Sequence, residues 1–316
     1  MHTISFDCEV ITPMFLAGAD GKTPEIREPS IKGALRFWWR ALHGHLMIND
    51  TKMPNGEVHK GLKSLENEIF GGGGDNACRS ALIIKTTHAE WDGSYSSYLL
   101  PHKSMGLTKA FNPDTPQHFE ISLFLTRSVR GFDMDKFKSL FVLACLLGGV
   151  GKRSRRGCGS VKIVGIKERD ETDFKPFDMP MTLNVILEEY INCFSSHYKL
   201  DNPSSPSAIC LNPSPLFKEA YPYIKGIQIG SKLYCDYGKF LYDIGKQTHD
   251  SRVNYPNDQS LGDAWGQERF ASPVYVSALK DLSGSYRAII TTLNMAAKNS
   301  FPVNSIKQNA FKNAIL

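Results

Sequence analysis

The sequence predicts an α+β protein of two domains, which we place at residues 1–169 and 170–316. Its 316 residues are 41% apolar and 22% charged, the composition of a folded globular protein. At about 100 to 200 residues per domain, this length is enough for two domains that each bury a core. Stretches in which apolar and polar residues alternate are interspersed with stretches whose apolar residues recur every three or four positions, so strands and helices are mixed along the chain.

The order of elements in the first half indicates a two-layer sandwich. Residues 4–11 alternate as a strand with one wet face, and Ser30 is the expected N-cap of the helix that follows. The predicted elements are, in order, a strand at 4–11, helices at 31–47 and 61–70, strands at 79–87 and 118–127, a helix at 133–147 and a strand at 160–166. Apart from the additional helix, this β-α-β-β-α-β order predicts a ferredoxin-like fold.

The second half is less regular. An acidic linker around 167–178 precedes a long amphipathic helix predicted at 181–198, and a loop rich in Ser, Pro and Asn follows at 201–215. Strands are then predicted at 224–230, 269–279 and 285–294, with a helix at 235–247 and a terminal helix. These patterns predict an α+β domain but do not define its topology.

Composition excludes several classes of protein. The seven cysteines are widely spread and never form a CxxC pair, so neither a disulfide framework nor a thiolate zinc site is expected, and a reducing cytoplasm fits best. No run approaches the roughly 18 to 20 apolar residues that cross a bilayer, and the first residues do not resemble a secretory leader. Because HExxH, P-loop and GxGxxG motifs are missing from the sequence, we expect no metal and no cofactor.

Positive charge is concentrated in the first half. The chain carries 21 basic and 16 acidic residues up to Gly165 and 16 of each beyond it, so the first half holds the whole net charge of +5. Such an asymmetry favours a polyanionic partner for the N-terminal half.

The strongest local signal is a glycine-rich basic loop at 148–160. It places four cations and five glycines between an apolar helix and an apolar strand, namely Lys152, Arg153, Arg155 and Arg156 with Gly148, Gly149, Gly151, Gly157 and Gly159. Cationic side chains and backbone amides in such a loop can contact phosphates together. The alternative is a solvated basic turn whose glycines serve a tight crossover.

A second signal is a basic stripe on the helix predicted at 31–47. Lys32, Arg36 and Arg40 recur every four residues and share one helix face, with Trp39 close by. Cations beside an aromatic ring suit an RNA backbone whose unstacked bases need a flat partner. The alternative is an ordinary solvated face with Trp38 and Trp39 both in the core.

These motifs resemble the RAMP superfamily of CRISPR systems, in particular the first-numbered subunit of the type III-B (Cmr) RNA-targeting complex. The matching segments are PMFLAGAD at 13–20, REPSIKGALRFWWRAL at 27–42, IFGGGG before a strand, GGVGKRSRRGCGS at 148–160 and RFASPVYVSAL at 269–279. They are spread in order over most of the chain, and only the stretch 170–265 lacks a recognisable block. A second glycine, common in the family near Ala17, is missing.

The resemblance implies two ferredoxin-like (RRM-like) domains, the second degenerate or elaborated. It also implies a non-catalytic, RNA-binding subunit of an antiviral ribonucleoprotein, with guide RNA (crRNA), target single-stranded RNA and other Cmr subunits as partners. Contact is expected near the 3′ end of the guide. The residues carried over as RNA-binding are Lys32, Arg36, Trp39 and Arg40 on the helix and Lys152, Arg153, Arg155 and Arg156 in the loop.

Two other functions remain open at the level of sequence. A metal-independent RAMP endoribonuclease that processes guide RNA needs a group that activates a 2′-OH and one that protonates the leaving oxygen, and His43 and His45 are the candidates for these roles. A scaffold that contacts only protein is the third possibility, but it leaves the charge surplus of the first half without an explanation.

Overall fold

The computed structural model describes residues 2–45, 58–73, 77–88, 94–115, 118–129, 131–168, 171–201, 208–212, 222–256, 258–262, 270–294 and 305–316. Within these ranges the chain forms two five-stranded sheets and one separate hairpin, and all pairings between the named strands are antiparallel. This arrangement confirms the predicted mixture of helices and strands.

The first sheet is made by the first half of the chain, extended by a short strand. Its elements are β1 (His2–Val10), α1 (Glu28–His43), α3 (Val58–Phe70), β2 (Leu82–His88), β5 (His118–Leu125), α4 (Met134–Leu147), β6 (Val161–Glu168) and β7 (Lys175–Pro176). The strands lie in the order β2-β5-β1-β6-β7. The predicted β-α-β-β-α-β order is therefore found, with α1 and α4 as the two crossovers.

Local sequence explains where the two crossover helices begin. Asp133 caps α4, because its carboxylate accepts a hydrogen bond of 3.0 Å from the amide of Lys136. The start of α1 differs from the prediction: the helix begins at Glu28, Arg27 occupies the N-cap position, and Ser30 lies inside the first turn. Pro29 favours this earlier start because its fixed φ angle fits the first helical turn.

The second sheet has a related connectivity. Its elements are β8 (Tyr198–Leu200), β9 (Ala208–Leu211), β10 (Ile224–Ile229), α6 (Tyr237–Asn254), β11 (Val274–Lys280), β12 (Tyr286–Leu293) and α7 (Ser305–Ile315). The strands lie in the order β11-β12-β10-β9-β8. The run β10-α6-β11-β12-α7 thus repeats the order of β1-α1-β2-β5-α4, and β9 takes the position beside β10 that β6 takes beside β1.

Three predictions of secondary structure need correction. The helix predicted at 181–198 is shortened to α5 (Leu183–Val185) and a π-helical turn at Ile186–Ile191, and residue 198 already belongs to β8. Strand β9 lies inside the segment predicted as a loop at 201–215. The hairpin of β3 (Ser96–Leu100) and β4 (Met105–Lys109) was not predicted, because most of its side chains are exposed or half-buried and show no clear apolar alternation.

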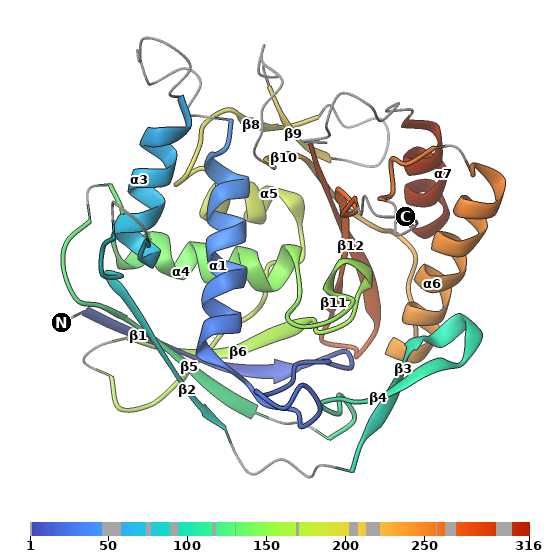
Figure 1. The fold of residues 1–316 in the computed structure, drawn as a ribbon, viewed down its shortest axis with the longest axis horizontal. Coiled ribbons are helices and arrows are strands. Elements are labelled where there is room, and N and C mark those ends of the chain that lie inside the picture. Colours follow the sequence, from blue (N-terminus) through green and yellow to red (C-terminus); the bar gives the residue numbers. More distant parts are fainter. Residues whose placement is uncertain are drawn as a thin grey trace.

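Helices α1, α3 and α4 lie on one face of the first sheet, while α6 and α7 cover the far side of the second sheet (Figure 1). One hydrophobic core joins the first sheet, α1, α4 and one face of the second sheet, from Phe6 to Leu293. A second core lies between the other face of the second sheet, α6 and α7, and it includes Ile11, Phe15 and Cys158 from the first half. The two halves therefore share buried surface, and the boundary at 169/170 stays a prediction.

Strand β11 shows why the second sheet is central. Val274, Val276 and Ala278 face the second core, whereas Tyr275 and Leu279 face the first. A strand buried on both faces is apolar along most of its length, which is the pattern of the segment VYVSAL. Among the described residues, no helix combines the length and apolarity needed to span a membrane.

Candidate nucleic-acid interface

The glycine-rich basic loop connects α4 to β6 and is held by backbone hydrogen bonds. The amide of Lys152 donates to the carbonyl of Phe15 at 2.9 Å, and that of Gly157 donates to Val276 of β11 at 2.8 Å. Within the loop, the amide of Val150 donates to the carbonyl of Gly159 at 2.9 Å. A single 3-10 turn, Ser154–Arg156, interrupts it. The loop is therefore fixed to both halves of the molecule.

The glycines shape this loop by close approach of backbone to backbone. Gly151 has a φ angle of +92°, and a Cβ atom there would lie 2.5 Å from the carbonyl oxygen of Phe15. Gly159 has a φ angle of +69°, and a Cβ atom would overlap the carbonyl oxygen of Val150. The remaining loop glycines, Gly148, Gly149 and Gly157, also have close neighbours where a side chain would begin. The protein itself thus requires these glycines, and their contact with phosphate stays a prediction.

Arg156 is a structural residue, which corrects its predicted place on an exposed loop. Its side chain is 7% exposed and donates to the carbonyls of Arg155 and Val274, both at 2.8 Å, and to Leu261 at 3.3 Å. It also donates to Ser272 Oγ at 3.0 Å and lies over the ring of Phe311. Burial, followed by the neighbouring arginines, lowers its pKa to about 9.

The other three cations of the loop reach the surface to different extents. Lys152 is exposed. Arg155 is half-buried, donates to the carbonyl of Ser272 at 3.2 Å and lies 4.9 Å from the centre of the Tyr275 ring. Arg153 adopts a left-handed backbone conformation with a φ angle of +64°, which is uncommon for a residue other than glycine. Among the described residues, none of the three has a carboxylate partner.

Among the described residues, the arginines of the basic stripe on α1 are paired with a carboxylate, unlike the cations of the loop. Arg36 and Arg40 both pair with Glu66 of α3, whose side chain is 4% exposed. Arg36 also donates to Asn67 at 3.1 Å and to the carbonyl of Gly71 at 3.2 Å. These contacts join α1 to α3, and they leave each arginine side chain 32% exposed. Burial, followed by the nearby Arg36, lowers the pKa of Lys32.

Trp39 does not have the exposed position that base stacking requires. It is 0% exposed, and its ring stacks on that of His43 with centroids 4.4 Å apart. Trp38 is also buried, at 2% exposure. The alternative in which both tryptophans belong to the core is therefore the correct one, and Trp39 is withdrawn as an RNA-stacking residue.

Of the two histidines considered for nuclease chemistry, His43 is half-buried and His45 is buried. Nδ1 of His43 lies 2.8 Å from the carbonyl oxygen of Trp39, and burial lowers the pKa of His43 to about 4. His45 is 3% exposed, its Nε2 lies 2.9 Å from Ser195 Oγ, and burial lowers its pKa to about 3. Both side chains are therefore neutral at pH 7, and only His45 lies wholly in the protein interior.

A pocket of about 310 Å³ opens between the loop and α6. Arg153, Arg155 and Arg156 line one side, and Arg252 and Thr248 of α6 line the other. We call it the arginine pocket. No acidic side chain of the described residues lines it. Arg252 is not predictable from the sequence, because the predicted helix ends at residue 247 and a single surface arginine forms no motif.

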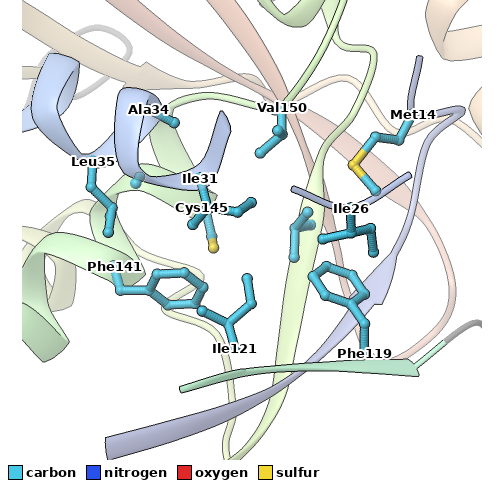
Figure 2. A pocket seen from close by; sticks show the side chains of 13 residues that line it. Met14, Ile26, Ile31, Ala34, Leu35, Phe119, Ile121, Phe141, Cys145 and Val150 are labelled. Carbon is cyan, nitrogen blue, oxygen red and sulfur yellow. The ribbon is translucent and has the colours of Figure 1, made fainter. Parts of the chain in front are cut away.

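A second cavity, beneath α1, has the opposite character (Figure 2). It has a volume of about 30 Å³ and is lined by apolar side chains of α1, α4 and the first sheet, among them Ile31, Phe119 and Phe141. The labelled side chains contribute only carbon and the sulfur atoms of Met14 and Cys145. This cavity is a small gap in the core and offers nothing to a charged ligand.

Comparison with known proteins agrees with the resemblance of the sequence motifs to the RAMP superfamily. A sequence model of the RAMP superfamily matches residues 7–162. Subunit Cmr1-2 of the CRISPR Cmr system of Pyrococcus furiosus is 29% identical over 197 residues, which cover 53% of this chain and 98% of that protein. Subunit Cmr1-1 of the same organism is 31% identical over 174 residues, which cover 52% of this chain and 48% of that protein.

Solved structures share the fold over the whole chain. The apo crystal structure of Cmr1 from Pyrococcus furiosus matches with a TM-score of 0.58 and 20% identity, covering 100% of this chain and 96% of that one. A chain in the cryo-EM structure of the Type III-B Cmr-beta bound to cognate target RNA and AMPPnP matches with a TM-score of 0.59 and 13% identity, covering 99% and 98%.

These comparisons confirm the resemblance found in the motifs. Residues 7–162 are similar in sequence to the RAMP superfamily. About half of the chain is similar in sequence to the Cmr1 subunits of Pyrococcus furiosus, and the whole chain shares the fold of Cmr1.

Proposed function

We propose that this protein is a non-catalytic, RNA-binding subunit of a type III-B (Cmr) CRISPR effector complex. The similarity to two Cmr1 subunits and the fold shared with a chain of an RNA-bound Cmr-beta complex support membership of such a complex. The observation that carries RNA binding is the glycine-rich basic loop, whose Lys152, Arg153 and Arg155 have no carboxylate partner among the described residues. The partners are guide RNA and target RNA, near the 3′ end of the guide, together with neighbouring Cmr subunits.

The same proposal includes the architecture. In a ferredoxin-like unit, the order β-α-β-β-α-β folds into an antiparallel sheet with both helices on one face. The first half meets this description through β1, α1, β2, β5, α4 and β6. The second half meets it through β10, α6, β11, β12 and α7, with β9 in place of the last strand. We therefore take the protein as two ferredoxin-like domains, the second one altered.

Binding through the loop is mainly electrostatic. A guanidinium group presents its donors in a planar fork that fits two phosphate oxygens, whereas the ammonium group of Lys152 acts as a point charge. Each phosphate contact releases condensed counterions, so affinity falls as the salt concentration rises. Because hydrogen bonds to Phe15 and Val276 fix the loop, its backbone is held in place before RNA binds.

The non-catalytic part of the proposal follows from the histidines. Acid-base cleavage of RNA needs titratable groups within hydrogen-bond reach of the 2′-oxygen and the leaving oxygen. His43 and His45 are neutral at pH 7, and they are half-buried and buried, respectively. A different pair, His102 and His249, lies beside the loop with ring centroids 5.8 Å apart, and its members are half-buried and exposed. In an endoribonuclease of this fold, these two accessible histidines would serve as the acid and the base. The test of catalysis therefore uses variants of His102 and His249.

RNA contact is tested by crosslinking the full chain, within a reconstituted Cmr complex, to guide and target RNA that carry photoreactive nucleotides. Crosslinked peptides from residues 148–160 are expected with at least one of the two RNAs. Crosslinks confined to α3 or to the β3–β4 hairpin would contradict the assignment of the loop.

Catalysis is tested by incubating the chain with labelled guide or target RNA, with and without magnesium. The RNA is expected to stay intact. If wild-type protein cleaves the RNA and the His102→Gln, His249→Gln double variant does not, the non-catalytic assignment is wrong. A His43→Gln, His45→Gln variant serves as the matched control, because both rings are neutral at pH 7 and contact hydrogen-bond partners within the protein.

A further inference from the structure

The arginine pocket gathers positive charge from two distant parts of the sequence. The loop contributes Arg153, Arg155 and Arg156, and α6 contributes Arg252, about a hundred residues further along the chain. Thr248 precedes Arg252 by four residues, so the two side chains lie on the same face of α6. Tertiary structure brings these residues together, so no single sequence motif predicts the pocket.

The charge inside this pocket is not balanced by the described residues. None of the salt bridges of the described chain involves Arg153, Arg155, Arg156 or Arg252. Arg156 is satisfied by carbonyl oxygens and a hydroxyl group, which accept its hydrogen bonds but do not neutralise it. Nε of Arg153 is buried without a hydrogen-bond partner among the described atoms. A buried donor of this kind is costly unless water or a ligand supplies the acceptor.

The electrostatic environment agrees with this geometry. Burial and then the positive charge of Arg252 lower the pKa of Arg153, and burial followed by Arg153, Arg252 and Arg155 lowers that of Arg156. The cations thus destabilise one another across the gap between the loop and α6. A bound anion would remove this repulsion, and a phosphate group would also offer oxygen acceptors to more than one guanidinium fork.

We propose that the arginine pocket binds a single phosphate group of an RNA chain, with Arg252 of α6 and Arg153 of the loop as its ligands. The proposal rests on the RNA-binding function proposed above and adds a site to it, because Arg252 lies outside both basic motifs. The pocket, at about 310 Å³, is at the small end of the range of about 300 to 1,000 Å³ that is typical of ligand sites. Arg156, held by its carbonyl contacts, forms the floor and contributes charge.

The site also explains the backbone of Arg153. A left-handed conformation is strained for a residue other than glycine, and such strain is concentrated at functional sites. The left-handed turn at Arg153 is followed by Ser154–Arg156 and a second left-handed residue, Gly157. This sequence of turns places three arginine side chains around one pocket.

The test compares Arg252→Gln and Arg153→Gln with Lys239→Gln in the full chain. Lys239 is an exposed cation on the same helix, 13 residues before Arg252 and hence about 20 Å away along the helix axis. The three variants lose the same charge, so long-range electrostatics are matched. Affinity for a single-stranded RNA is measured by fluorescence anisotropy at several salt concentrations. Protection by inorganic phosphate is measured as a shift in the thermal unfolding temperature.

We expect Arg252→Gln and Arg153→Gln each to weaken RNA binding about tenfold and to abolish the stabilisation by inorganic phosphate. Lys239→Gln should change RNA affinity less than twofold and keep the phosphate effect. RNA binding by wild type that is unaffected by Arg252→Gln would overturn the phosphate pocket while leaving the proposed function intact. If wild type binds no RNA, the RNA-binding function fails instead.

Two RNAs of the same sequence then identify the source of the phosphate. One carries hydroxyl groups at both ends, and the other carries terminal phosphates. If Arg252→Gln weakens both RNAs equally, the pocket binds an internal phosphodiester. If it weakens only the RNA with terminal phosphates, the pocket binds a chain end. An equal response of Lys239→Gln and Arg252→Gln in both assays would mean that the pocket is not a specific site.

Discussion

The α1 stripe and the glycine-rich loop have similar charge patterns in the sequence but opposite electrostatic states in the fold. The stripe contributes Arg36 and Arg40, which share the buried carboxylate of Glu66. The loop contributes arginines whose hydrogen bonds go to neutral carbonyls, such as that from Arg155 to Ser272. A stripe of cations is therefore not by itself a binding surface. Whether such cations can bind an anion depends on whether the fold supplies a counter-charge.

The largest difference is expected from glycine substitutions in the two regions. Gly159→Ala places a Cβ atom onto the carbonyl of Val150 at a φ angle of +69°, so we expect a loss of about 3 to 4 kcal/mol in the free energy of unfolding. Gly33→Ala, beside the stripe, meets nothing within 4 Å and should leave stability equal or slightly higher. Urea unfolding of both variants measures the contrast.

Gly131→Ala separates the two causes of the loss at Gly159. Gly131 has the same φ angle of +69° but no atom within 4 Å of the added Cβ. It should lose only about 1 kcal/mol, the cost of the backbone conformation. Equal losses at Gly131 and Gly159 would show that the close approach to Val150 is not important.

Removing the counter-charge of the stripe tests the comparison directly. Glu66→Gln leaves Arg36 and Arg40 without a carboxylate, so we expect a loss of about 2 kcal/mol in stability, less than for a fully buried pair because the arginines are partly exposed. The same variant should bind RNA more tightly, since two cations are released. Glu68→Gln, an exposed acid on the same helix, is the control. If the two variants behave alike in urea unfolding and RNA binding, Glu66 does not neutralise the stripe.

The histidines that follow the stripe predict a pH dependence of stability. His43 and His45 have folded-state pKa values of about 4 and about 3, below the value of about 6.5 for an unfolded chain. Between these values the unfolded state binds more protons, so stability is full above pH 6.5 and is lost as the pH falls. From pH 7 to pH 5 we expect a loss of about 1 to 2 kcal/mol per histidine.

Urea unfolding at pH 7, 6 and 5 measures this slope. His45→Gln can keep a hydrogen bond to Ser195 but does not titrate, so it should reduce the slope by about one histidine's share. An unchanged slope in this variant would mean that His45 is charged in the folded protein.

A further difference between the two regions is expected in RNA affinity. Replacing Lys152 and Arg155 with Gln should weaken RNA binding about tenfold, or about 1.4 kcal/mol, and reduce the salt dependence by up to two phosphate contacts. Lys32→Gln should change affinity less than twofold, because Lys32 is half-buried beside Leu82. Fluorescence anisotropy titrations measure both affinities. If Lys32→Gln weakens RNA binding more than the double variant does, the α1 stripe is the main RNA surface.

Most of the first sheet was predictable because its elements repeat clear periods. The alternation in residues 118–127 predicts β5, and the acidic first turn and apolar run at 133–147 predict α4. The second sheet was harder to predict from the sequence, because β11 is buried on both faces and β9 is short and lies within a polar segment. Such strands are defined by their neighbours rather than by their own pattern.

The site was predictable in position but not in detail. The density of glycine and arginine identified the loop at 148–160, yet only tertiary structure shows that Arg156 is buried beneath β11 and that Arg252 completes the pocket. The burial of Trp39 was equally hard to predict from the sequence, because α1 is covered on more than one side, by the sheet, α3 and α4. Amphipathic spacing identifies one buried face of a helix and does not reveal a second.

The attachment of the loop has a consequence for its dynamics. The amides of Val150, Gly157 and Gly159 donate to carbonyls of Gly159, Val276 and Pro13, which belong to separate parts of the chain. The bonds from Gly157 and Gly159 cannot open without separating the loop from segments that the two cores hold in place. Although the loop is irregular, the amide protons of Gly157 and Gly159 should therefore exchange with solvent as slowly as those of the central strands.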